Sequence, residues 1–322
     1  MTEIGREVKE SHLERTAAEP RDRAMHSVIL SDIQPVGRTI RVLRLQIPPG
    51  SPDIQFLPGQ WIDTFCPGVT KAGGFTITSA PSRAVSRQDG HPCYIELAVR
   101  QASDNPAAEW LWQPAAAILG DTLQVRVGGS FVFPPPSLGG SPTLAPRARF
   151  VFVAGGVGIN PLISMLSYLG DQQEAAPVVE MLYSTREEES LSTNSKADDD
   201  SPASRVLFLD RLASLFSTER LRGKLQLFLT GGSIFAGLSG KLMCNGLDVS
   251  YGRKRITTAD LDAAVLGGLG TGEDHASIIK RTYVYVCGVP AMTDAFVAHL
   301  TASRKSGGLG LPLSNVLYEK WW

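Results

Sequence analysis

A glycine-rich turn is the feature of this sequence that points most directly to chemistry. Residues 155–161 read Gly-Gly-Val-Gly-Ile-Asn-Pro, after an apolar run at Phe150–Ala154 and before apolar residues at helical spacing. We interpret the run as a buried parallel strand, Asn160 as a helix N-cap and Pro161 as the first helical residue. Such a turn lets the backbone approach a pyrophosphate that the helix N-terminus attracts. The expected nucleotide-binding residues are therefore Gly155, Gly156, Val157, Gly158, Ile159, Asn160 and Pro161.

This turn departs from the common dinucleotide fingerprint, because proline takes the place of the third glycine in Gly156-x-Gly158-x-x-Pro161. Proline at that position indicates another nucleotide-binding design, found where nicotinamide meets flavin. A tight turn in an unrelated α/β domain is the alternative.

Two further strand ends bring polar side chains to the same edge of the predicted sheet. Residues 178–183 and 224–230 are predicted parallel strands, and ligands bind at the carboxyl ends of such strands. An adenosine ribose would therefore lie among Ser184, Arg186 and Thr230. Arg186 suits a 2′-phosphate, but the carboxylates of residues 187–189 would repel one if they shared its pocket. The sequence thus favours NADH over NADPH, the alternative use of those carboxylates being a solvated helix start.

A fourth predicted strand, residues 283–288, runs into a turn at Cys287-Gly288, and Pro290 then opens a helix that contains Met292. This context favours a functional cysteine, although a lone cysteine at a strand end is more often a packing residue. The remaining cysteines have no such context and are interpreted as packing residues: Cys66, Cys93 and Cys244. With no Cys-x-x-Cys pair and no histidine cluster, neither an iron–sulfur nor a zinc site is expected.

The composition is that of an ordinary protein of two domains. The 322 residues are 43% hydrophobic and carry a formal net charge of −1, which gives no reason to expect nucleic acid or an anionic membrane as a partner. No apolar run reaches the ~20 residues of a membrane span. Residues 1–25 include Glu3, Glu7 and other acids, unlike a transit peptide, and we interpret them as a flexible or helical extension.

Short β patterns separated by turn residues fill the region before the glycine-rich turn and predict an antiparallel barrel. One helix interrupts them at residues 106–112, with Asn105 as its N-cap. A stretch rich in proline, glycine and serine follows and indicates a linker. The predicted organisation is an extension at 1–25, a barrel at 26–135, a linker at 136–148 and an α/β domain at 149–322, with a polar insertion at 190–203 and a loop or hairpin at 231–255.

A barrel, a linker and a nucleotide-binding domain that opens with Gly-x-Gly-x-x-Pro resemble the ferredoxin–NADP reductase superfamily. Within it, the chain is similar to the oxidoreductase NAD-binding domain-containing proteins. The motifs that carry this resemblance are His-Leu-Glu-Arg-Thr-Ala at 12–17, Pro-Gly-Gln-Trp at 58–61, Gly-Gly-Phe at 73–75, Ala-Gly-Gly-Val-Gly-Ile-Asn-Pro at 154–161, Cys-Gly at 287–288 and Glu-Lys-Trp-Trp at 319–322.

The resemblance implies a flavin site that has lost one charge. In the superfamily, a strand of the type Arg-x-Tyr-Ser pairs arginine with a phosphate, packs tyrosine on the flavin and brings the hydroxyl to ring N5. The matching residues are Gly73, Gly74, Phe75 and Thr76, continued by Ile77 and Thr78, so the arginine is missing. A helix-opening Gly-x-x-Ser motif that binds the flavin phosphates becomes Asn105-Pro106-Ala107-Ala108. Lys71 or Arg100 would have to supply the missing charge.

The resemblance also implies where hydride transfer takes place. Cys287 and Gly288 match a pair beside the nicotinamide, and Glu319-x-Trp321 matches an ending whose aromatic ring covers the flavin, with Trp322 as an extra residue. The implied catalytic residues are Thr76, Cys287 and Glu319. A terminal strand anchored in the core is the alternative for the two tryptophans.

The predicted fold is an antiparallel flavin-binding-type barrel followed by a parallel-sheet nucleotide-binding domain. The implied function is a flavin-dependent NAD(P)H oxidoreductase that uses FAD or FMN, favours NADH and passes electrons to an unidentified small molecule or redox protein. The alternative is a scaffold or nucleotide-sensing protein on the same fold, with a decayed flavin site. The cysteines indicate a reducing, intracellular compartment. The resemblance implies the mitochondrion, and the N-terminus leaves the cytoplasm open.

Overall fold

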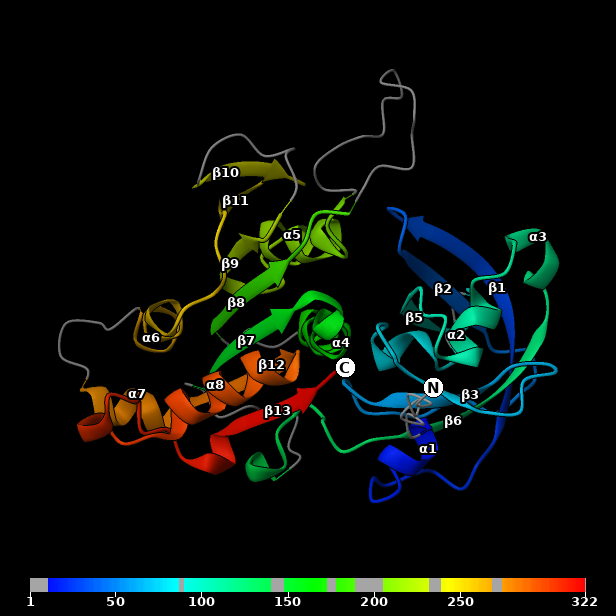
Figure 1. Ribbon diagram of the computed structural model, residues 1–322, viewed down its shortest axis with the longest axis horizontal. Coiled ribbons are helices and arrows are strands. Elements are labelled where there is room, and N and C mark those ends of the chain that lie inside the picture. Colours follow the sequence, from blue (N-terminus) through cyan, green and yellow to red (C-terminus); the bar gives the residue numbers. More distant parts are fainter. Residues whose placement is uncertain are drawn as a thin grey trace, which may run out of the picture.

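The computed structural model describes residues 11–86, 90–139, 148–172, 178–188, 205–231, 239–267 and 274–321, which form two β-sheets and their helices (Figure 1). The first sheet contains β1 (His26–Val36), β2 (Ile40–Gln46), β3 (Trp61–Phe65), β4 (Gly73–Thr76), β5 (Tyr94–Arg100) and β6 (Thr122–Gly128). The second contains β7 (Arg149–Gly155), β8 (Val178–Thr185), β9 (Arg222–Leu229), β10 (Ser239–Cys244), β11 (Leu247–Gly252), β12 (Thr282–Gly288) and β13 (Val316–Lys320). The α-helices are α1 (His12–Arg15), α2 (Pro106–Leu111), α3 (Ala115–Ile118), α4 (Ile159–Asp171), α5 (Leu209–Ser217), α6 (Thr258–Leu266), α7 (His275–Arg281) and α8 (Pro290–Thr301).

The first sheet is antiparallel throughout, in the order β4-β3-β6-β1-β2-β5, and confirms the predicted antiparallel fold. It curls like a barrel but stays open. Among the described residues, a single isolated bridge between Ile77, just after β4, and Leu97 of β5 links its two edges. One core lies inside the curl, where Ile62 and Leu97 share a cluster with Ala107 and Leu111 of α2. The helix therefore fills the space that the strands enclose.

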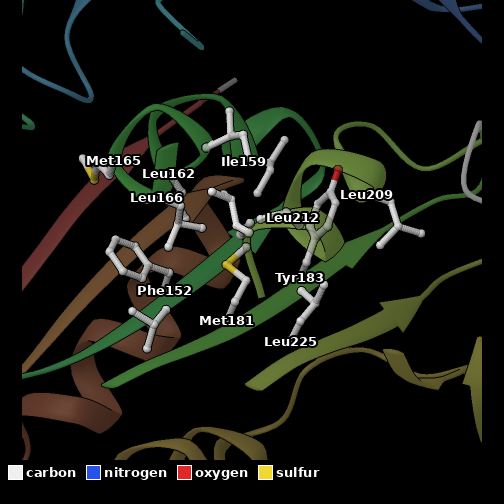
Figure 2. Packing of buried hydrophobic residues seen from close by; sticks show 14 of the residues in the cluster. Phe152, Ile159, Leu162, Met165, Leu166, Met181, Tyr183, Leu209, Leu212 and Leu225 are labelled. Atoms are coloured by element: carbon white, nitrogen blue, oxygen red, sulfur yellow. The ribbon is translucent and has the colours of Figure 1, made fainter. Parts of the chain in front are cut away.

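The second sheet has the order β10-β11-β9-β8-β7-β12-β13, and all its pairs are parallel except β10 with β11. Its apolar strands are covered on both faces, as their sequences predicted. Phe152 and Met181 pack beneath α4 and α5 (Figure 2), while Val151 and Val153 pack on the opposite face with α6, α7 and α8. Alternate residues of one strand thus serve two separate cores.

Two local expectations meet different outcomes. The segment 231–255, predicted as a loop or hairpin, contributes the hairpin β10–β11 within its described part. By contrast, α4 begins at Ile159 after a 3₁₀ turn at Gly156–Gly158, so the prediction of Asn160 as N-cap is wrong. The prediction of Pro161 as the first helical residue is wrong for the same reason, since Pro161 is the third residue of α4. The Asn160 amide instead donates to the carbonyl of Ala98 in β5, 2.9 Å away, because the helix start lies against the other sheet. The insertion at 190–203 lies outside the described residues.

The two sheets are joined by a seam of buried polar and aromatic contacts. Arg211 of α5 donates two hydrogen bonds of 2.8 Å to Glu96 of β5, whose side chain is almost fully buried. Phe133, which follows the first sheet, lies in the core of the second, and Tyr285 donates to the carbonyl of Val132. In Figure 1, β13 runs toward this seam. None of the described helices is long and apolar enough to cross a membrane.

Candidate nucleotide and flavin site

The glycine-rich turn forms one wall of a cavity of about 620 Å³. The cavity lies at the carboxyl ends of β7, β8, β9 and β12, where a parallel sheet binds its ligands. Most of the predicted nucleotide-binding side chains and turn residues line it: Gly155, Gly156, Val157, Ser184, Arg186, Thr230, Gly288, Met292 and Trp321. Ile159 and Pro161 are buried in α4 beneath the turn. Their role toward a cofactor stays a prediction.

Two glycines of the turn have a clear physical requirement. Gly156 has φ of 56°, a left-handed conformation that side chains disfavour. A Cβ atom on Gly158 would lie 2.6 Å from the carbonyl carbon of Cys287 and 2.9 Å from the amide nitrogen of Gly288. Only glycine at 158 therefore lets the turn pack so closely on the end of β12, while Gly155 and Gly156 line the cavity.

Cys287 and Glu319 come together with Trp321, and of these three residues Trp321 lines the cavity. Cys287 and Glu319 are partners in the register of β12 and β13. The Trp321 indole donates to Glu319 Oε2 at 2.9 Å, and its backbone N–H donates to the carbonyl of Gly288 at 3.0 Å. The ending therefore continues the parallel pairing of β13 with β12 by one residue. Trp322 lies outside the described residues.

Burial favours the protonated forms of the Glu319 carboxyl and the Cys287 thiol. It raises the pKa of the Glu319 carboxyl to about 8, so the group is mostly neutral at pH 7. Burial also raises the pKa of the Cys287 thiol well above its ordinary value, and the neighbouring Glu319 carboxyl adds to the effect. A thiol with a raised pKa is a poor nucleophile. Cys287 is thus suited to contact and shape, and Glu319 to holding a proton.

The predicted flavin strand, β4, differs in how its side chains are used. The hydroxyl of Thr76 is buried and has no hydrogen-bond partner among the described residues. Thr78 donates to Glu96 at 2.7 Å, and Ile77 is fully buried in the core of the first sheet. Of these side chains, only that of Thr76 keeps a polar atom without a partner among the described residues, and this atom is buried.

The predicted phosphate position beside α2 is closed. A Cβ atom on Gly73 would lie 2.7 Å from both the Phe75 ring and the Ala107 side chain, because Phe75 packs across this glycine. The Asn105 side chain accepts the N–H groups of Ala107 and Ala108 at 3.1 and 3.2 Å. The backbone N–H groups that a phosphate would use are therefore already bonded to the N-cap side chain.

The carboxylates expected to repel a 2′-phosphate do not line the cavity. Glu187 and Glu188 are both buried, so their prediction as a solvated helix start is wrong. Glu188 accepts from Thr39 and pairs with Arg100 at 3.4 Å, and Glu187 lies 3.6 Å from Arg253. Both carboxylates are therefore compensated by arginines and do not line the cavity. Glu189 lies outside the described residues.

Sequence reasoning missed Arg255, which lines the same cavity as Arg186. Neither guanidinium forms an ion pair within the described part of the chain. Arg255 follows β11, and β11 runs parallel to β9, so the segment after it reaches the same carboxyl edge. The capping box of Thr257 and Asp260, just beyond, was a usable signal of a strand-to-helix turn here. The described residues contain no group of ligands that could hold a metal ion.

Comparisons with solved structures bear on the fold. A ferredoxin NADP⁺ reductase from Neisseria gonorrhoeae, with bound FAD and NADP, superposes with a TM-score of 0.56 at 17% identity over 93% of this chain and 99% of its own. A cytochrome P450 reductase from Amycolatopsis has a TM-score of 0.60 at 17% identity over 94% of this chain and 70% of its own. The fold is therefore that of ferredoxin reductase-like proteins.

Comparisons of sequence bear on the family. No protein-family model matches the chain. The oxidoreductase NAD-binding domain-containing protein 1 of Bos taurus is 32% identical over 323 residues, which cover 97% of this chain and 85% of the relative. The protein of the same name from Homo sapiens is 30% identical, with 98% and 85% covered. The chain belongs to the family of oxidoreductase NAD-binding domain-containing protein 1.

Proposed function

We propose that this protein is an NAD(P)H-dependent flavoprotein oxidoreductase that delivers electrons to an acceptor not yet identified. The observation that supports this proposal best is that Cys287 and Glu319 are register partners directly behind Gly288 and Trp321, two residues that line the cavity of the glycine-rich turn. Orientation and exclusion of water are what a protein contributes when cofactors carry the chemistry. The acceptor is a small molecule or a redox protein.

Each group of residues has a part in this reaction. A bound flavin supplies the hydride acceptor and relays electrons onward. Gly155 and Gly156 present backbone to the nucleotide, Gly158 lets the turn pack on β12, and Gly288 and Met292 bound the nicotinamide end. Glu319 holds a proton beside Cys287, and Trp321 covers that end of the cavity. Thr76 offers a hydroxyl that has no partner within the described protein, which fits a flavin as ligand.

The choice of nucleotide follows from the charges near the ribose. Because Glu187 and Glu188 are buried in ion pairs and do not line the cavity, the reason for favouring NADH falls away, and Arg186 with Arg255 favours a 2′-phosphate. We therefore propose that NADPH reduces the flavin at least as fast as NADH. Stopped-flow reduction with both nucleotides tests this. The Arg255→Gln variant should lose about tenfold in affinity for NADPH and little for NADH, and equal losses would contradict the proposed 2′-phosphate contact.

A scaffold function is the second candidate, supported by the closed position at Gly73 and by the self-capped α2. Titration of the purified protein with FAD and FMN, followed by fluorescence, separates the two. Saturable binding and reduction by NAD(P)H support the reductase. No binding of either flavin at high micromolar concentration would refute it. The mitochondrial location implied by the resemblance, with the cytoplasm as the alternative, stays a prediction. Imaging of the tagged chain in cells tests it.

A further inference from the structure

The segment before β1 is anchored to the first sheet by a buried carboxylate. Asp63 is fully buried and accepts from His12 at 3.0 Å, Arg21 at 3.0 Å and Arg126 at 2.7 Å. Burial alone would raise the pKa of Asp63, but hydrogen bonds from His12, Arg126 and Arg21 outweigh it and lower the pKa to about 2. The carboxylate is thus charged at all physiological pH values.

Gly74 makes room for this anchor. A Cβ atom there would overlap the imidazole of His12, which also stands edge-on to Trp61 with ring centroids 4.7 Å apart. The second glycine of the Gly73-Gly74 pair therefore serves the docking of α1. The loss of arginine at 73 and the docking of His12 at 74 occur on the same short strand.

The docked α1 closes one side of a second cavity, of about 690 Å³, whose other side is the start of α2. Arg15 and Lys71 line it, together with the hydroxyl-bearing Ser11 and Thr70. Arg15 forms no hydrogen bond or ion pair among the described residues. The opposing carboxylates are Asp104, on the cavity wall, and Glu14, whose carboxylate is held by the N–H and hydroxyl of Ser11 while it interacts with Lys71.

We propose that this α1–α2 cavity is the phosphate subsite for the flavin, with Arg15 and Lys71 supplying the charge that position 73 lacks. The inference rests on the proposed function. It also accounts for three otherwise separate facts: the closed position at Gly73, the capped start of α2 and the anchored α1. The cavity includes Ala72 and Asn105, so it adjoins both the flavin strand and the helix start.

The test compares flavins with and without a phosphate. The full chain is titrated with riboflavin, FMN and FAD, and the ratio of riboflavin Kd to FMN Kd measures what the phosphate contributes. We expect FMN to bind about ten- to a hundredfold more tightly than riboflavin. Arg15→Gln and Lys71→Gln should each lower FMN affinity about tenfold and leave riboflavin affinity unchanged. In the double variant, the ratio of riboflavin Kd to FMN Kd should fall to about one. Circular dichroism checks that each variant is folded.

Arg83→Gln is the matched control, because Arg83 is exposed and lines a different cavity. It should leave the ratio unchanged. If flavins bind but neither Arg15→Gln nor Lys71→Gln alters the ratio, the subsite is wrong while the proposed function stands. If riboflavin, FMN and FAD all fail to bind the wild-type chain, the proposed function is refuted and the subsite with it.

Discussion

The neutral carboxyl of Glu319 should make the stability of this protein fall as pH rises. The pKa of this group is about 8 in the folded chain against an ordinary value of 4.5. The folded state therefore binds more protons than the unfolded state between these values, so stability decreases with pH there. At about 1.36 kcal/mol per pKa unit, the total loss from this one group is on the order of 5 kcal/mol.

Glu319→Gln removes the titration and keeps an acceptor for the Trp321 indole. We expect the variant and the wild type to have free energies of unfolding within about 1 kcal/mol of each other at pH 4.5, and the variant to gain stability relative to wild type until about pH 8. Urea unfolding at several pH values, followed by tryptophan fluorescence, measures the difference. Glu109→Gln, at an exposed carboxylate of α2, is the control.

Parallel stability curves for Glu319→Gln and the wild type would refute the reasoning, because they would mean that Glu319 ionises as it does in water. If the stability of Glu319→Gln and of Glu109→Gln fell with pH as much as that of the wild type, the effect would belong to another group. A difference that opens between pH 4.5 and 8 and then stays constant is the expected result.

The remaining predictions concern the anchor, the turn and the ending. Asp63→Asn leaves the side chains of Arg21 and Arg126 without a carboxylate partner and should lower the free energy of unfolding by about 3–5 kcal/mol, measured by urea unfolding at pH 7. A loss near zero would mean that Asp63 does not hold the segment before β1. Gly158→Ala should weaken NAD(P)⁺ binding at least tenfold in calorimetry, since its Cβ atom would strike the end of β12, whereas Gly252→Ala has room and should bind normally. Trp321→Ala should tighten NAD⁺ binding about tenfold by opening the cavity, with Trp322→Ala as control; unchanged affinity would make the indole a structural anchor alone.

The sequence predicted best what depends on nearby residues. The apolar runs at β7 and β12 and the glycine-rich turn carry their own periodicity, and the structure confirms both strands and brings Cys287 beside Glu319. The uses of Asn160 and Glu188 were missed because their partners lie far away in the chain, on Ala98 and Thr39. An amide that suits a helix cap suits a tertiary contact equally well, and the local pattern does not distinguish them.

Arg255 was missed for a different reason. Its place depends on the direction of β11, and the residues of that hairpin carry no signal of whether the strand runs parallel or antiparallel to β9. The closing of position 73 depends on the rotamer of Phe75 and on the distance to Ala107, neither of which a sequence pattern contains. The fold class was therefore predictable, and the arrangement of charges around the ligands was not.

The seam between the sheets limits how this protein can be recombined. Glu96 belongs to the first half of the chain and its guanidinium partner Arg211 to the second, so the two halves are complementary parts of one buried ion pair. A chimera that joined this first half to the nucleotide domain of a relative lacking Arg211 would bury a carboxylate without its counter-charge. Exchanges between family members should therefore succeed when both residues are transferred together. Engineering of nucleotide preference is best confined to Arg255 itself, because the hairpin before it contacts α5 through Asn245, and α5 carries Arg211.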